Sequence, residues 1–190
     1  METRNIMIVG VGGQGTLLTS RILGGLAIRA GYDVKLSEVH GMAQRGGSVV
    51  TFVRYGDKVC EPIVEPGCAD VLIAFEKLEA LRYIHYLKKD GVLILNDTRI
   101  DPMPVVMGAA EYPKNIVEDL KKEHTVYVVD ANLEAQILGN PRCFNVIVLG
   151  MAARHMDYSY EDWIAVIEKT VPAKTIEINK KAFDRGYNLK

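Results

Sequence analysis

IMIVGVGGQG, the stretch from Ile6 to Gly15, joins a short apolar run to a glycine-rich turn. Four consecutive apolar residues that end at Gly10 are typical of a strand buried on both faces. Beyond the turn, apolar residues recur at helical spacing as far as Ala30, and Gly31 stands where a helix commonly ends. A strand, a tight turn and a helix therefore open the fold.

The rest of the chain continues this alternation. Strands are expected at residues 33–38, 48–54, 71–75, 92–95 and 125–129, with helices between the later ones and over most of the C-terminal third. The turn at residues 55–58 predicts that the third strand forms a hairpin with a short strand near Val59 and Cys60. We therefore expect an α/β fold: a single Rossmann-like domain over residues 1–190, with a mostly parallel sheet, a β-hairpin insertion and a helical C-terminal third.

Several residues predict local features. Lys88 to Gly91 carries the residue types of a helix C-terminus. The adjacent glycines Gly24 and Gly25, inside the first helix, predict close packing against a neighbouring backbone. Asp130 is expected to cap the helix that follows it, and Ser159 with Asp162 resembles a capping box.

Composition limits the possible functions. The 190 residues carry a net charge of −1, which gives no argument for binding nucleic acid or an anionic membrane. The three cysteines show no C-x-x-C pair, so an iron–sulfur or zinc site held by this chain alone is not expected. The N-terminus lacks the pattern of a signal peptide, and no segment approaches the length of a membrane span. A cytoplasmic protein with free thiols is the expectation.

The glycine turn matches G-x-G-x-x-G between a strand and a helix. Its candidate binding residues are Gly10, Gly12, Gly13, Gln14 and Gly15. Glycines let a ligand reach the backbone, and a helix N-terminus offers free N–H groups to a phosphate or carboxylate. Glu38, at the end of the second predicted strand, stands where an NAD enzyme places its ribose-binding acid. The alternative is a tight turn that only packs against another chain.

A second motif follows the second predicted strand, EVHGMAQRGGS from Glu38 to Ser48. Arg45 could grip an anion through its planar fork, and His40 could transfer a proton. The remaining candidates for contact with a ligand are Gln44, Gly46 and Gly47. The alternative is a surface loop that docks a partner, with His40 as a bystander. Elsewhere, Glu76 and Asp97 are better explained as helix-cap or turn residues than as ligands.

Neither a Ser-His-Asp arrangement nor a phosphate-binding loop of the G-x-x-x-x-G-K-[ST] type is evident in the sequence. Two hypotheses from other functional classes stay open. One is a self-sufficient NAD-dependent dehydrogenase, and the other is a stand-alone nucleotide-binding module.

Taken together, the segments IMIVGVGGQGTLLTSRILG and SEVHGMAQRGGSVVTFVRYG resemble the small, gamma-type subunit of 2-oxoacid:ferredoxin oxidoreductases. The segments DVLIAFEKLEALRYIHYLKKDGVLILND and NKKAFDRGYN fit the same family, so the resemblance covers nearly the whole chain. The form EVHGMAQRGG points to the indolepyruvate branch.

The resemblance implies an accessory subunit of a hetero-oligomeric oxidoreductase. Such a complex decarboxylates a 2-oxoacid, here an aryl pyruvate, to an acyl-CoA and passes electrons to ferredoxin. Thiamine diphosphate and iron–sulfur clusters would reside on the large catalytic subunit, and this chain would be inactive alone. By the same resemblance, the residues of the two motifs from Gly12 to Gly15 and from Arg45 to Gly47 would face the partner or coenzyme A.

Overall fold

The computed structural model describes residues 1–41 and 46–189. In this part of the chain, six strands form one sheet with the order β2-β3-β1-β4-β5-β6. Strands β1, β4, β5 and β6 are parallel to one another, and β3 is antiparallel to both of its neighbours. The strands are β1 (Arg4–Val11), β2 (Asp33–His40), β3 (Ser48–Gly56), β4 (Ala69–Ala74), β5 (Leu87–Asn96) and β6 (Thr125–Val129).

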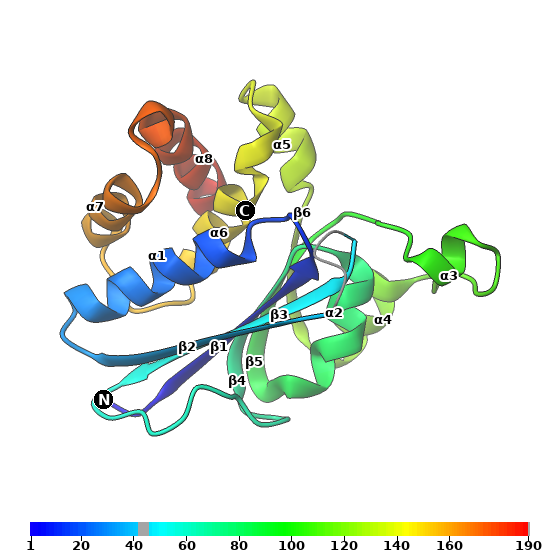
Figure 1. The fold of residues 1–190 in the computed structure, drawn as a ribbon, viewed down its shortest axis with the longest axis horizontal. Coiled ribbons are helices and arrows are strands. Elements are labelled where there is room, and N and C mark those ends of the chain that lie inside the picture. Colours follow the sequence, from blue (N-terminus) through cyan, green and yellow to red (C-terminus); the bar gives the residue numbers. More distant parts are fainter. Residues whose placement is uncertain (42–45, 190) are drawn as a thin grey trace.

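Helices cover both faces of the sheet, as Figure 1 shows. One face packs against α1 (Thr16–Arg29), α6 (Phe144–Ala153), α7 (Tyr160–Thr170) and α8 (Ile176–Asn188), with α5 (Ala131–Ile137) beside them. The other face carries α2 (Lys77–Tyr83) and α4 (Ile116–Glu123), while α3 (Met103–Val106) stands away from the body. The short 3₁₀ helices are η1 (Ile84–Tyr86), η2 (Pro141–Cys143) and η3 (Ala173–Thr175).

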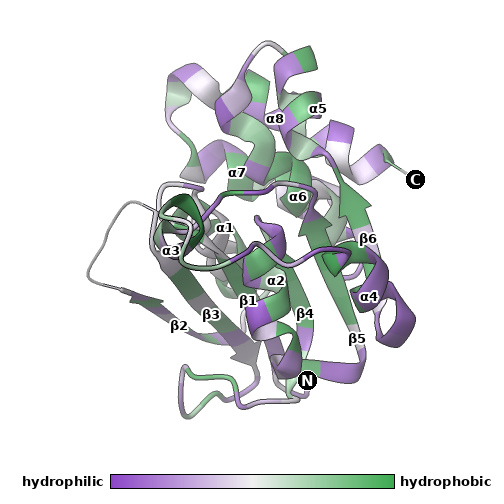
Figure 2. Cartoon of the chain, turned by 90° about the vertical axis from the view of Figure 1, so that its right-hand side faces the viewer, coloured by the Kyte–Doolittle hydropathy of each residue, from purple (hydrophilic) through white to green (hydrophobic). Residues whose placement is uncertain are grey.

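The alternation of side chains along β1 builds two cores. Ile6 and Ile8 belong to the core beneath α1 and α6, whereas Met7 and Val9 belong to the core beneath α2 and α4. All four side chains are buried, because a strand between two helical layers has no solvent-facing side. Figure 2 shows the same hydrophobic character along the central strands β4 and β5.

The predicted α/β class, the mostly parallel sheet and the helical C-terminal third are confirmed. Two caps are also as predicted: Asp130 accepts a hydrogen bond from the Leu133 N–H, and Ser159 accepts one from the Asp162 N–H. Gly31, with φ of 82°, ends α1 in the left-handed conformation.

The predicted partner strand of the hairpin is wrong. No strand forms near Val59 and Cys60, and the hairpin consists of β2 and β3 instead. Both edges of β3 are occupied, by β1 and β2, so the segment after it has no free edge to join. The Val59 N–H donates to the Asp33 side chain instead of to a strand.

The predicted helix end at Lys88–Gly91 is also wrong, because these residues lie inside β5. The β4–β5 pairing is irregular here, with Ala69 opposite Leu87 and Val71 opposite Val92. A Cβ atom on Gly91 would lie 2.9 Å from the Ala69 carbonyl oxygen. The glycine therefore serves a close approach within the sheet.

The close backbone contact predicted at Gly24 and Gly25 is wrong, because both glycines face side chains. A Cβ atom on Gly24 would meet the Leu36 side chain, and one on Gly25 would meet Val166. Backbone meets backbone between α6 and α8, where a Cβ on Gly186 would lie 1.8 Å from the Ile147 carbonyl oxygen. This crossing fastens the C-terminal helix to the buried helix α6.

Candidate functional site

The glycine turn lies at the carboxyl end of β1, the edge at which open α/β sheets bind ligands. Gly13 and Gly15 have φ of 99° and 89°, a conformation that other residues rarely adopt. A Cβ atom on Gly15 would lie 2.1 Å from the Asn145 amide nitrogen, whereas one on Gly13 would have no heavy atom within 4 Å. Gly15 is therefore required by packing, and Gly13 presents open backbone.

Gln14 points inward and holds the turn together. Its Oε1 accepts a hydrogen bond from the Val11 N–H at 2.7 Å, and its Nε2 donates to the Phe75 carbonyl at 3.1 Å. The Phe75 N–H in turn donates to the Val9 carbonyl, so the turn is tied to the end of β4. The sequence predicts Gln14 as a ligand contact, but both polar atoms of its amide form hydrogen bonds that stabilise the turn. Gly10 belongs to the same packing, because a Cβ there would lie 2.9 Å from the Gln14 Oε1 atom.

The two sequence motifs touch each other. The Gly12 N–H donates to the Gly47 carbonyl oxygen at 2.9 Å. Gly46, with φ of 78°, is exposed next to this contact. Gln44 and Arg45 lie outside the described residues, so their predicted contacts stay predictions. The end of the second motif, at Gly46 and Gly47, therefore lies beside the glycine turn.

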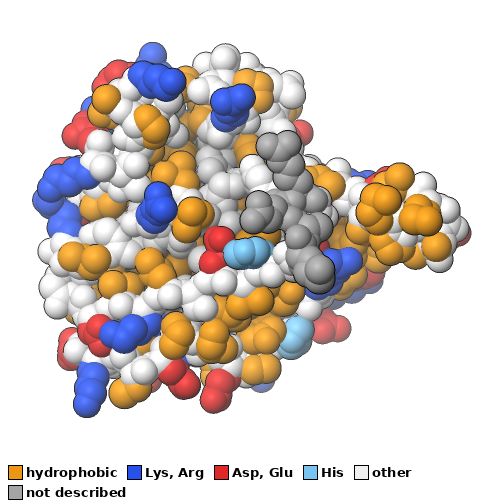
Figure 3. Space-filling view, in the orientation of Figure 1, with side chains coloured by type: hydrophobic (Ala, Val, Ile, Leu, Met, Phe, Trp, Pro, Cys, Tyr) orange, Lys and Arg blue, Asp and Glu red, His pale blue; other side chains and the backbone are white. Residues whose placement is uncertain are grey.

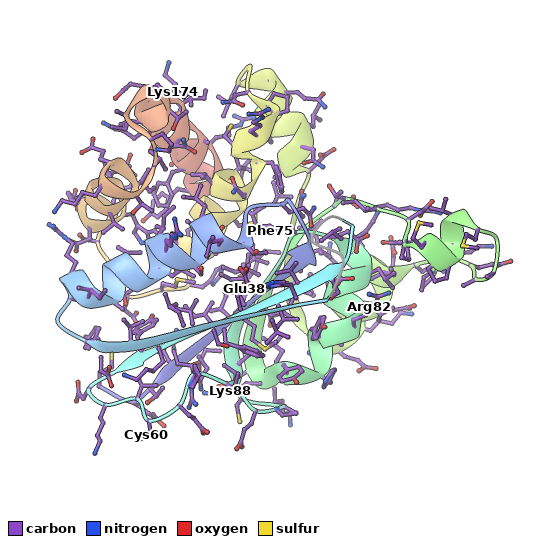
Figure 4. All side chains as sticks on the ribbon, viewed as in Figure 1. Glu38, Cys60, Phe75, Arg82, Lys88 and Lys174 are labelled. Atoms are coloured by element: carbon purple, nitrogen blue, oxygen red, sulfur yellow. The ribbon has the colours of Figure 1, made fainter. Side chains whose placement is uncertain are left out.

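Glu38 is held by hydroxyl groups from two elements. Its Oε2 accepts hydrogen bonds from Thr16 at 3.3 Å and from Thr51 at 3.2 Å, and the His40 Nδ1 lies 3.8 Å from its Oε1. Thr51 pairs with Glu38 across the β2–β3 hairpin. Figure 4 shows Glu38 between the N-terminal half of α1 and the strands below it. Neither threonine is predicted from the sequence: the register of the β2–β3 hairpin would indicate Thr51, whereas Thr16 reaches Glu38 only through the packing of α1.

A hollow of about 430 Å³ lies between the turn and the end of β2. Its walls are the turn glycines, Thr16 and Leu17 of α1, Glu38 and His40 of β2, and Val49 of β3. Within the described residues, the N–H groups of Gly13, Gly15 and Thr16 have no hydrogen-bond acceptor. Free N–H groups at the start of a long helix favour a phosphate or carboxylate group.

A buried carboxylate, Glu79, supports the end of the second motif. Glu79 of α2 accepts hydrogen bonds from the Ser48 hydroxyl and from the Arg82 guanidinium. Burial raises the pKa of Glu79, and its bond with Ser48 opposes that shift. Ser48 directly follows Gly47, so this contact fixes the start of β3 next to the Gly12 contact. The i, i+3 spacing of Glu79 and Arg82 indicates their ion pair in the sequence, but no local pattern indicates the contact between Ser48 and Glu79.

The described residues contain no group of three or more His, Cys, Asp or Glu side chains placed to hold a metal ion. Cys60 is exposed, Cys68 is half-buried and Cys143 is buried. In the same part of the chain, no helix is both long and apolar enough to cross a membrane. The described part of the site offers backbone donors, a restrained carboxylate and a histidine.

Residues 5–189 match the family described as pyruvate ferredoxin/flavodoxin oxidoreductase. The chain belongs to this family. It is 44% identical over 193 residues to the indolepyruvate oxidoreductase subunit IorB of Pyrococcus horikoshii, covering 98% of this chain and 95% of that one. The subunit of the same name from Archaeoglobus fulgidus is 44% identical over 189 residues, covering 97% and 94%.

A crystal structure of the pyruvate oxidoreductase subunit PORC of Thermotoga maritima has the same fold. It superposes with a TM-score of 0.73 at 25% identity, covering 98% of this chain and 96% of that one. The family predicted from the paired glycine motifs is therefore confirmed.

Proposed function

We propose that this chain, acting as one gamma-type domain over residues 1–190, is the accessory subunit of a hetero-oligomeric 2-oxoacid ferredoxin oxidoreductase that acts on an aryl pyruvate such as indolepyruvate. The complex decarboxylates the 2-oxoacid, transfers the acyl group to coenzyme A and reduces ferredoxin. The observation that carries the proposal is its similarity to the indolepyruvate oxidoreductase subunits, which extends over almost the whole chain.

The chain's residues suit a supporting part in this chemistry. Thiamine diphosphate and iron–sulfur clusters supply the decarboxylation and electron transfer when bound, and we place them on the large subunit. The described residues offer no cluster of metal ligands that would fit an iron–sulfur centre. What the chain supplies is a preorganised wall of backbone donors at a helix N-terminus.

Coenzyme A fits the hollow through its phosphates. The hollow of about 430 Å³ lies within the range of small-molecule pockets, roughly 300–1,000 Å³. The free N–H groups of Gly13, Gly15 and Thr16 would bind one phosphate group, and Arg45 would add a charged fork. We infer that the large subunit completes this site and that the complex works in the cytoplasm.

The strand order argues against a self-sufficient NAD enzyme. In dinucleotide-binding folds the second strand lies directly beside the first, whereas β3 separates β2 from β1 here. Thr16 and Thr51 also hold one oxygen of Glu38, which ties this carboxylate to the fold and leaves only Oε1, with the His40 Nδ1 3.8 Å away, for a ligand. The strand order favours the accessory subunit over the dehydrogenase, and the similarity to oxidoreductase subunits over almost the whole chain favours it over a stand-alone nucleotide-binding module.

Co-expression with the large subunit tests the proposal. We expect a stable complex that reduces ferredoxin with indolepyruvate and coenzyme A, and no turnover by the isolated chain. Turnover by the isolated chain, or micromolar NAD binding to it in calorimetry, would refute the accessory role.

Two glycine variants test the coenzyme A wall. Gly13→Ala and Gly31→Ala place a Cβ in open space at similar positive φ, 99° and 82°, so their backbone strain is matched. Of the two, only Gly13 lines the hollow, because Gly31 follows the C-terminus of α1, at the opposite end of that helix. We expect Gly13→Ala alone to raise the KM for coenzyme A, by about tenfold if one phosphate contact is lost. Equal KM values for the two variants would remove coenzyme A from the hollow.

A further inference from the structure

Residues 100–112 form an arm that projects from the body of the protein and carries α3 near its end (Figure 1). From Pro102 to Ala110, nine consecutive residues carry no charge. Met103, Val106 and Met107 expose 66%, 64% and 74% of their surfaces. Figure 3 shows hydrophobic side chains gathered at the end of this arm. The arm therefore presents an apolar tip to its surroundings.

A buried carboxylate clamps the base of the arm. Glu76, which is 1% exposed, accepts hydrogen bonds from the Ile100 N–H at 3.1 Å and from the Tyr112 hydroxyl at 2.5 Å. Its other oxygen caps α2 by accepting the Glu79 N–H. The Arg99 guanidinium lies over the Tyr112 ring, 4.4 Å from its centre. Both ends of the arm are thus fixed to one buried side chain.

The arm also satisfies its own backbone. Hydrogen bonds within it run from the N–H groups of Val105, Val106, Met107, Gly108, Ala109 and Ala110 to carbonyls of residues 102–105. A segment with this internal bonding and a fixed base loses little conformational freedom when it binds. Its apolar tip is consequently preorganised, as a docking element requires.

We propose that this arm inserts its apolar tip into an uncharged, apolar recess on the large catalytic subunit, an inference that rests on the proposed function. The arm follows the carboxyl end of β5, and the glycine turn follows the carboxyl end of the parallel strand β1, so both lie at one edge of the sheet. A partner that completes the hollow at this edge is placed to receive the arm as well. Three exposed apolar side chains without a charge among them match an apolar recess and disfavour a charged surface.

A second copy of this chain is a poorer match for the tip. Hollows of about 720 Å³ and about 430 Å³ among the described residues both contain carboxylates, Glu111 and Glu118 in the first and Glu38 in the second. Neither offers an uncharged recess, so inserting the tip into either hollow of a second copy would bury apolar side chains against charge. The large subunit is therefore the occupant that the tip fits.

The test compares Val106→Asp and Met103→Asp with a control, Ile28→Asp. Ile28 is 66% exposed near the far end of α1, so its exposure matches that of the tip residues. The dissociation constant of the complex is measured by titrating each purified chain with the large subunit, and the melting temperature of each chain checks its folding. We expect the tip variants to weaken the complex by about tenfold or more, and the control to change it by no more than about twofold.

Three results would overturn the inference. One is wild-type affinity in both tip variants, and the second is an equal loss in the Ile28→Asp control. The third is loss of a homodimer of this chain with assembly on the large subunit unchanged, which would assign the tip to a second copy. If the wild-type chain itself failed to assemble with the large subunit, the proposed function would fail instead, so the two failures are distinguishable.

Discussion

Replacing Gly186 by alanine tests how α6 and α8 are joined. The added Cβ would lie 1.8 Å from the Ile147 carbonyl oxygen and 2.7 Å from its carbon, whereas ordinary contact begins near 3.4 Å. The two helices would have to separate locally by about 1.5 Å, against backbone atoms that cannot rotate away. Phe183, stacked on the fully buried Trp163 at 5.4 Å, would move with α8.

The energy balance favours a clear loss of stability. Overpacking a core costs about 1–3 kcal/mol, and a backbone clash belongs at the upper end of that range. The higher helix propensity of alanine offsets about 1 kcal/mol of this loss in folding stability. We therefore expect Gly186→Ala to lower the free energy of unfolding by about 2 kcal/mol, which lowers the melting temperature by about 4–8 °C for a chain of this size.

Gly24→Ala is the matched control in thermal and urea unfolding. It is also a helix-interior glycine, but its Cβ would meet only the tip of Leu36, at 3.1 Å. The Leu36 side chain is partly exposed and can move aside, so this variant keeps the propensity gain and should be neutral or up to about 1 kcal/mol more stable. Equal shifts in the two variants, or a more stable Gly186→Ala, would refute the backbone-contact argument.

Two further variants address the site. Burial raises the pKa of Glu79, so its proton is held more tightly in the folded state, and its contribution to stability is present at low pH and lost as pH rises from about 4.5 through the raised value. Glu79→Gln should therefore flatten the stability profile above about pH 4 in urea unfolding, and an unchanged profile would contradict this. Arg45→Lys keeps the charge but loses the planar fork, so the activity of the complex at limiting coenzyme A should fall by about tenfold. Unchanged coenzyme A dependence would remove Arg45 from the site.

The glycine motifs show which features a local sequence pattern can predict and which it cannot. The strand, the turn and the helix after it could be predicted from Ile6 to Ala30, because their hydrophobic period and glycines act within a few residues. The role of each motif residue could not. The sequence predicts Gln14 as a ligand contact, yet its side-chain amide forms hydrogen bonds with the backbones of Val11 and Phe75. Phe75 lies far along the chain, and no local period encodes that contact.

The arm at residues 100–112 shows the opposite limit. Its prolines and short apolar run show neither a helical nor a strand period, and the sequence explains Glu76 by its place near a helix start. The clamp arises only when Ile100 and Tyr112 converge on that carboxylate. A buried side chain that joins segments distant in sequence leaves no periodic trace.

Four features could be predicted from the residues alone: the α/β class, the glycine turn at the first helix, the helical C-terminal third and, through two motifs, the family. These depend on hydrophobic period, capping residues and glycines, which act locally. Three others emerge only in the folded molecule: β3 lies between β1 and β2, Gly12 contacts Gly47, and α6 contacts α8 at Gly186. Strand order and close approach are non-local, because they depend on which edges and surfaces remain free once the other elements have packed.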